Sequence, residues 1–266
     1  MAKRDQLRSL RSGTIINTTS KTQEKHITLA LEKVVAQLQA SSPVALHHER
    51  EWKLCDIVAH LKKHFCDVDF YCHFKSSAIR PDGGILRLVA NDGEQFPILI
   101  AEVKNQGTND LRALEGLDRQ AKGNAVERLG KNVIGLRAAL RTETIFPFVC
   151  FGYGCDFEPD SSILDRVVTI AIFGRLNETY LHALGSDNQF DRGSFYFRPR
   201  QWTIDEMADI MFDIAKRSVQ YYFSKYGEKR FLPEASTSPT RIDSAVALLS
   251  APLIRKGLPP AKKDIK

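Results

Sequence analysis

Two carboxylates and one lysine, separated by a predicted hairpin, have the composition of a site that hydrolyses phosphodiesters. The run Pro-Asp-Gly-Gly contains Asp82, and the run Ala-Glu-Val-Lys contains Glu102 and Lys104. Both carboxylates can bind Mg²⁺, which prefers oxygen ligands, and the backbone carbonyl of Val103 is a further candidate ligand. Such a metal polarises a phosphate and acidifies a water. Lys104 could orient or help deprotonate that water and neutralise developing charge. The trio predicts an enzyme that cuts nucleic acid.

The predicted hairpin would bring these three side chains together. Residues 85–90 and 96–104 are rich in apolar and β-branched side chains and flank Asn-Asp-Gly-Glu at 91–94, which is a hairpin signal. If the strands pair symmetrically, Asp82 lies opposite the end of the second strand. The two charged residues of Glu-x-Lys are two positions apart and share a face of that strand. We expect all three to converge on one spot.

The same residues also have a purely structural interpretation. Pro-Asp-Gly is an ordinary turn sequence, and Glu-x-Lys on a strand is an ordinary solvated ion pair. Against this interpretation, residues 98–101 read Ile-Leu-Ile-Ala and are typical of a buried strand. Charged side chains at the end of such a strand are costly unless they are paired or functional. The spacing alone leaves both interpretations open.

Length and charge predict one main domain with appendages. The chain has 266 residues with 43% hydrophobic content, enough for one substantial core. Its net charge of +6 and its pI of about 9.0 give weak support to a nucleic-acid partner. We expect a flexible basic arm at residues 1–22, a single nuclease domain with catalytic and recognition elements at 23–233, and a loosely ordered tail at 234–266.

The cysteines and the hydropathy predict a cytoplasmic protein. Five cysteines form no C-x-x-C pair, and their odd number suits free thiols in a reducing compartment and disfavours a zinc site. No apolar run reaches the length of a membrane span, and the polar start lacks the apolar region of a signal peptide. We therefore expect no membrane partner.

Apolar periodicity and capping residues predict an α/β fold. Asn124 is a natural N-cap that forms a capping box with Glu127, and Thr203 forms another with Glu206. A buried strand at 145–152 follows the helix that Asn124 opens, which completes a β-α-β unit typical of a mixed sheet. The predicted helices cover about 27–38, 51–65, 125–141 and 204–223, and a further strand is expected at 167–173.

These motifs together resemble the EcoRI family of type II restriction endonucleases, within the PD-(D/E)xK nuclease superfamily. The resemblance is carried by residues 76–85, which include the Pro-Asp motif, by 101–107, and by the spacing between them. Two further patches are Gly-Asn-Ala-Val-Glu-Arg at 123–128, followed by Lys-Asn at 131–132, and residues 210–214. The resemblance covers about 50–220 and implies a restriction-endonuclease-like core, in which helices flank a mixed central β-sheet.

The resemblance also implies residues that read DNA. A helix N-terminus can enter the major groove, where Asn pairs with adenine and Arg donates to purine N7. The implied target is a palindrome with an AATT core, cut to leave 5′-phosphates and four-base 5′ overhangs. The chain departs from the family just before Asn124, so the outer base pair stays open among GAATTC, CAATTG (read by the related MunI) and RAATTY. The candidate base-reading residues are Asn124, Ala125, Glu127 and Arg128, with Gln120 and Lys122 for the outer base pair and Arg166 as a further recognition arginine.

The partners follow from the same resemblance. A palindromic double-stranded DNA target implies a homodimer, and the family implies a DNA methyltransferase that protects the host. Arg166 also has a purely structural interpretation, as a surface arginine paired with Asp165. Two other function classes remain as alternatives: a DNA-repair or recombination nuclease on the same core, and a DNA-binding protein without catalysis. The presence of Asp82, Glu102 and Lys104 disfavours the second.

Overall fold

The computed structural model describes residues 15–105, 116, 124–154, 176–182 and 193–233. By its internal contacts the chain divides into two units, Met1–Pro233 and Glu234–Lys266. Every described element belongs to the first unit, and the second unit lies outside the described residues. The division of the chain into an arm, a nuclease domain and a tail stays a prediction.

A mixed five-stranded sheet lies at the centre of the first unit, as the sequence predicted. The first two neighbouring pairs in the sheet are antiparallel and the last two are parallel. The β5-α5-β6 connection gives the predicted β-α-β unit. The strands, in the order in which they pair, are β1 (Ala45–Glu49), β4 (Gly84–Val89), β5 (Gln95–Asn105), β6 (Phe148–Tyr153) and β7 (Ser194–Arg198).

The predicted hairpin is formed by β4 and β5. Gly84 pairs with Ala101, so the residues just before β4 lie beside the second half of β5, as expected. The turn is closed by local bonds: the Gly93 amide donates to the Ala90 carbonyl at 2.8 Å, and the Glu94 amide donates to the Asp92 carboxylate at 2.9 Å. Gly93 has φ of 85°, a conformation in which glycine avoids the strain of other residues.

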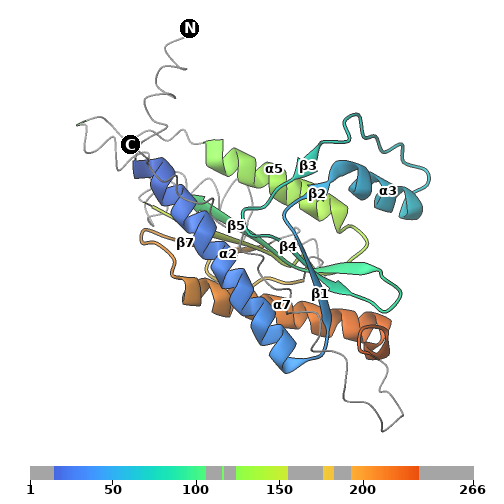
Figure 1. Cartoon of the computed structure of the whole chain (residues 1–266). Helices are drawn as coiled ribbons and strands as arrows, with labels where there is room; N and C mark the ends of the chain where they lie inside the picture. Colours follow the sequence, from blue (N-terminus) through green and yellow to red (C-terminus); the bar gives the residue numbers. More distant parts are fainter. Residues whose placement is uncertain (1–14, 106–115, 117–123, 155–175, 183–192, 234–266) are drawn as a thin grey trace, which may run out of the picture. The chain divides into compact units, whose positions relative to one another are not determined.

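Two long helices cover one face of the sheet. Helix α2 (Ile15–Ser41) and helix α7 (Ile204–Tyr226) pack against each other and against β5 (Figure 1). α2 begins at Ile15 and therefore includes residues 15–22, which the sequence assigned to a flexible arm. The capping box of α7 is confirmed, since Thr203 and Glu206 exchange hydrogen bonds. Tyr222 of α7 is fully buried and packs in the core between these helices and the sheet.

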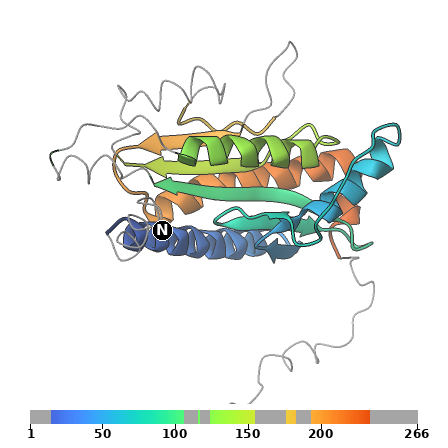
Figure 2. The same ribbon diagram turned by 90° about the horizontal axis from the view of Figure 1, so that it is seen from above.

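Helix α5 (Asn124–Ala139) covers the opposite face, and Figure 2 shows the strands between α5 and α2. Its buried stripe packs with Ile100 of β5 and with Phe148 and Cys150 of β6. The stripe consists of Leu129, Val133 and Leu136. These side chains repeat at helical spacing, so the sequence predicted this helix correctly.

Helix α3 (Leu54–His64) begins later than the predicted residue 51. The residues before it, β2 (Trp52–Lys53), pair instead with β3 (Ala78–Ile79) in a small two-stranded sheet. A short 3₁₀ helix, η2 (Glu228–Arg230), follows α7. The strand expected at 167–173 lies outside the described residues. Within the described ranges, no helix has the length and apolar character needed to cross a membrane.

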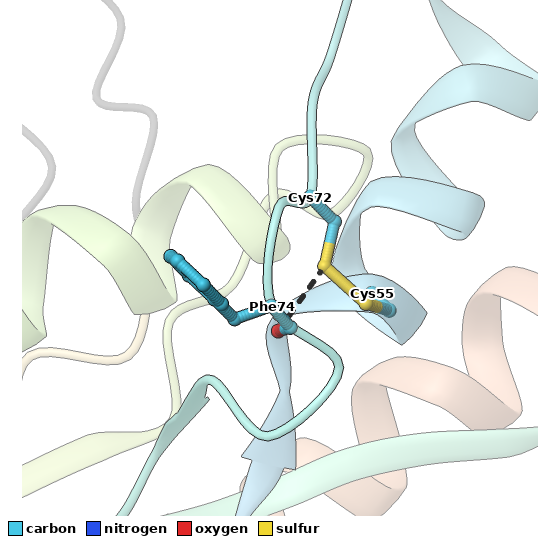
Figure 3. The surroundings of a disulfide bond; sticks show 3 residues. All are labelled: Cys55, Cys72 and Phe74. Carbon is cyan, nitrogen blue, oxygen red and sulfur yellow. Dashed lines mark hydrogen bonds between the residues drawn. A yellow bond between two sulfur atoms is a disulfide. The ribbon is translucent and has the colours of Figure 1, made fainter.

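A disulfide joins α3 to the segment that follows it, contrary to the expectation of free thiols. Cys55 and Cys72 are bonded, with their Cα atoms 5.4 Å apart (Figure 3). The chain turns back after α3, and Cys72 Sγ lies 3.6 Å from the Phe74 carbonyl oxygen. Sequence spacing gave no sign of this pairing because it depends on that reversal. Cys66 and Cys150 are free, while Cys155 lies outside the described residues.

Candidate active site

The structure brings together the three predicted catalytic residues. Glu102 and Lys104 point to the same face of β5 as Ile100, the face that α5 covers. Asp82 lies in the turn before β4, with its carboxylate 3.1 Å from Lys104 Nζ. Lys104 Nζ also contacts Glu102 Oε1. The amide of Val103 donates to Asp82 Oδ2 at 3.2 Å, and the amide of Asp82 donates to Glu102 Oε2 at 3.2 Å.

Three oxygens surround the Lys104 ammonium, and they belong to the three predicted metal ligands. Besides the two carboxylates, Lys104 Nζ donates to the backbone carbonyl of Val103 at 3.2 Å. The lysine thus acts as a stand-in cation within an all-oxygen donor set, which is the set that Mg²⁺ prefers. Among the described residues, no cluster of three or more His, Cys, Asp or Glu side chains could hold a metal. The third oxygen at this site is the backbone carbonyl of Val103, and a cluster of side chains does not include a backbone atom.

The turn that carries Asp82 is held by close backbone contacts. The Gly83 amide donates to the Ala101 carbonyl at 2.9 Å, and the Gly84 amide donates to the Pro81 carbonyl at 2.9 Å. A Cβ atom on Gly83 would lie 2.9 Å from the Cβ of Ala101. Gly84 has φ of 74°, and a Cβ there would lie 2.5 Å from the Glu49 carbonyl oxygen. The two glycines therefore allow the turn to lie against β5 and β1.

Burial and neighbouring charges shift the pKa values of Glu102 and Lys104. The Glu102 side chain is 2% exposed. Burial raises the pKa of Glu102, opposed by the positive charge of Lys104 and reinforced by Asp82. Burial disfavours the charge on Lys104, but the carboxylates of Glu102 and Asp82 outweigh it and raise the pKa of this lysine. Burial also raises the pKa of the neighbouring Cys150 thiol well above its usual range. Lys104 is therefore a charged hydrogen-bond donor at neutral pH, and the Cys150 thiol beside it is uncharged.

Sequence reasoning missed Asn132 as a residue of this site. Its side-chain Nδ2 donates to Glu102 Oε1 at 3.3 Å from helix α5. The signal was present in the helical spacing, because Asn132 follows Leu129 by three positions and precedes Val133 on the inward face. A polar side chain on an inward face requires a buried partner.

The predicted recognition residues are described only in part. Asn124, Ala125, Glu127 and Arg128 form the start of α5, so the backbone is helical there. Their side chains lie outside the description, as do all atoms of three other candidates, Gln120, Lys122 and Arg166. The base-reading roles and the capping box at this helix start stay predictions.

Comparison with known proteins gives consistent matches. The family model described as restriction endonuclease EcoRI matches residues 10–229. The type II restriction enzyme RsrI of Cereibacter sphaeroides is 32% identical over 179 residues, which cover 55% of this chain and 65% of RsrI, just under two thirds of its length. The type II restriction enzyme EcoRI of Escherichia coli is 29% identical over 203 residues, covering 63% of this chain and 73% of EcoRI.

Proposed function

Because the chain belongs to the EcoRI family of type II restriction endonucleases, we propose that it hydrolyses phosphodiester bonds of double-stranded DNA at a fixed sequence, with Mg²⁺ as cofactor. The observation that carries the proposal is the arrangement of Asp82, Glu102 and the Val103 carbonyl around the Lys104 ammonium. A DNA-binding protein without catalysis has no need for a buried and a half-buried carboxylate around one cation, since the burial of charge is costly.

The proposed reaction uses the trio in separate roles. Asp82, Glu102 and the Val103 carbonyl would hold Mg²⁺, which when bound polarises the scissile phosphate and acidifies the attacking water. Lys104 keeps its proton and donates a hydrogen bond to the water or to a phosphate oxygen, where it neutralises developing negative charge. The Asp82 amide holds Glu102 Oε2, and the Val103 amide holds Asp82 Oδ2. These backbone bonds limit the rotation of both carboxylates.

The proposed target is a palindrome with an AATT core. Its readers are Asn124, Ala125, Glu127 and Arg128 at the N-terminus of α5, where a helix can enter the major groove. Side-chain amides suit adenine and guanidinium groups suit purine N7. We propose that the outer base pair, in GAATTC, CAATTG or RAATTY, is read with help from Gln120, Lys122 and Arg166.

A palindromic target fits a homodimer with one active site for each strand. We propose that the two cuts leave 5′-phosphates and four-base 5′ overhangs. A methyltransferase that modifies the same sequence would protect host DNA, and both enzymes would work in the cytoplasm, where that DNA lies.

The test is digestion of a sequenced plasmid with purified protein and Mg²⁺, followed by sequencing of the fragment ends. We expect discrete cuts at AATT-centred sites, and the reads also identify the outer base pair. The Glu102→Gln variant is expected to bind the same DNA without cutting it, because one metal ligand loses its charge. Nicking that follows DNA structure rather than sequence would contradict the restriction function and favour a repair nuclease. Cleavage by Glu102→Gln at the wild-type rate would contradict the site.

A further inference from the structure

Asn132 connects the helix that begins with the recognition segment to the most buried carboxylate of the site. Among the contacts of Glu102 with described residues, those from Asp82 and Lys104 come from the hairpin and the turn before it. Asn132 Nδ2 alone of these partners comes from α5, and it donates to Glu102 Oε1 at 3.3 Å. The Glu102 carboxylate is therefore held from two sides, by the sheet and by the helix.

Helix α5 is also packed tightly against the segment that leads to Asp82. A Cβ atom on Gly135 would lie 2.9 Å from Cδ1 of Ile79, so glycine permits a close approach between α5 and β3. Gly135 follows Asn132 by three positions and lies on the same side of the helix. Leu129 and Leu136 are buried in the core on that side. A displacement of α5 along its axis would therefore move Asn132 relative to Glu102.

The length of the helix places Asn132 close to the predicted base readers. Asn132 lies about two turns after Asn124, which is roughly 12 Å along the axis of an α-helix. A regular helix transmits such a displacement with little loss. The position of the recognition segment and the position of the Asn132 amide are thus coupled by one rigid element.

The bond to Asn132 becomes more important when Lys104 turns toward DNA. Glu102 Oε1 contacts both Lys104 and Asn132. If the Lys104 ammonium moves to a phosphate or a water, only the Asn132 amide of these two side chains still donates to Glu102 Oε1. The Asp82 amide holds Oε2, so without Asn132 the buried Oε1 would have neither of its two side-chain donors, which is costly and leaves the carboxylate held from one side.

We propose that Asn132 is a positioning residue that orients the Glu102 carboxylate for metal and ties that orientation to the placement of α5. The inference rests on the proposed function, because it assigns Glu102 to metal binding. Asn132 acts through Glu102. Partners of metal ligands typically change metal affinity or activity by about 10- to 100-fold when they are removed.

The experiment measures Mn²⁺ binding by the full-length protein. Free aqueous Mn²⁺ is followed by electron paramagnetic resonance, which reports the Kd without any cleavage. In Asn132→Leu, the amide is replaced by an apolar side chain of similar volume, and we expect the Kd for Mn²⁺ to rise about tenfold. Ile134→Ala is the matched control on the same helix, because Ile134 is exposed. We expect its Kd to equal that of the wild type.

Two further comparisons separate positioning from a general loss of structure. In a Glu102→Gln background, Asn132→Leu should cause no additional loss of Mn²⁺ affinity, because its partner no longer binds metal. The Tm of Asn132→Leu should stay within a few degrees of the wild type. In plasmid cleavage, the Mg²⁺ concentration for half-maximal rate should also rise about tenfold.

The outcomes distinguish this inference from the proposed function. A Kd within twofold of the wild type in Asn132→Leu overturns the inference, and cleavage by the wild type would then still support the function. If Asn132→Leu has a higher Kd for Mn²⁺ but the wild type cuts no DNA, the proposed function is overturned, while the role of Asn132 in positioning Glu102 is supported. The inference is also overturned if Asn132→Leu lowers the Mn²⁺ affinity as much in the Glu102→Gln background as it does in the wild type.

Discussion

At the scale of single residues, Lys104 has a dual relation to the proposed metal. Its ammonium contacts the same three oxygens that would bind Mg²⁺. Two cations cannot share that position, so metal binding requires the lysine to leave it. The lysine would then be free to meet the water or the phosphate. The same side chain that serves the reaction thus competes with the metal in the DNA-free protein.

The competition predicts opposite effects of one substitution on metal binding and on cleavage. Lys104→Met should abolish cleavage, but it should lower the Kd for Mn²⁺ of the DNA-free protein by about tenfold or more. Two unit charges about 4 Å apart interact by about 4 kcal/mol at an effective dielectric constant of 20. Removal of the ammonium therefore removes a large repulsion against the bound Mn²⁺. Titration followed by electron paramagnetic resonance gives the Kd.

The matched control is Lys33→Met, which removes an exposed lysine that pairs with Asp205 away from the site. We expect this variant to bind Mn²⁺ as the wild type does. Weaker Mn²⁺ binding by Lys104→Met would mean that the lysine organises the carboxylates rather than competing with the metal.

Sequence patterns revealed the charged trio but not the Asn132 side chain that contacts it. Asp82, Glu102 and Lys104 were found because their motif fixes residue types and order. Asn132 was missed because its role depends on how α5 lies over β5, and one sequence does not specify that distance. The contact of Lys104 with the Val103 carbonyl likewise depends on the side-chain conformation. The chemistry of the site was therefore predictable from the sequence, but the geometry of the site was not.

At the scale of elements, the start of α7 gives a stability prediction that depends on pH. Arg198 donates to both Glu206 carboxylate oxygens, and the Thr203 amide donates to Oε2 at 2.9 Å. These bonds hold the pKa of Glu206 well below its usual range. A carboxyl group with a lowered pKa in the folded state stabilises the fold above its unfolded pKa and loses this effect as pH falls through the folded pKa.

Glu206→Gln should therefore lower the free energy of unfolding at pH 7 by about 1 kcal/mol, a modest value because solvent reaches the Glu206 side chain. The difference from the wild type should shrink only in strong acid, below the ordinary pKa of a glutamate. Urea unfolding followed by circular dichroism at several pH values measures this. Thr203→Ala removes the capping hydroxyl but keeps the charge of Glu206, and it should lower the free energy of unfolding by about 1 kcal/mol. A constant difference between Glu206→Gln and the wild type at every pH would contradict the charge argument.

The disulfide gives a second prediction at this scale. Cys55 and Cys72 close a loop with a sequence separation of 17. A cross-link of about this length stabilises a fold by about 3 kcal/mol. We expect a reductant to lower the free energy of unfolding of the wild type by up to that amount, whereas the Cys55→Ser, Cys72→Ser double variant should be insensitive. Alkylation of all five cysteines without reductant would contradict the bond.

Local signals predicted some elements and missed others for physical reasons. The β4–β5 hairpin, α5 and the capped start of α7 follow from turn residues, apolar spacing and capping residues. The start of α3 was wrong because Trp52 pairs with Ile79, a long-range contact. The disulfide was missed for the same reason. Contacts between residues far apart in the sequence leave no local pattern.

At the scale of the whole molecule, the proposed palindromic target requires two active sites, one for each DNA strand. The chain has a mass of 30.0 kDa, and we expect sedimentation in solution at twice that mass. If each protomer cuts one strand with its own Asp82, Glu102 and Lys104, a dimer of one wild-type and one Glu102→Gln chain should cut a single strand. Supercoiled plasmid would then become open circles rather than linear molecules.

This prediction is tested with mixed dimers that carry different affinity tags on the two chains and are purified through both tags. The wild-type dimer should give linear plasmid, and the Glu102→Gln dimer should leave it supercoiled. Linear product from the mixed dimer, at the rate of the wild type, would show that one active site cuts both strands in turn. Sedimentation at the mass of one chain, with both strands still cut, would mean that the chains meet only on DNA, since a twofold-symmetric target can itself bring two protomers together.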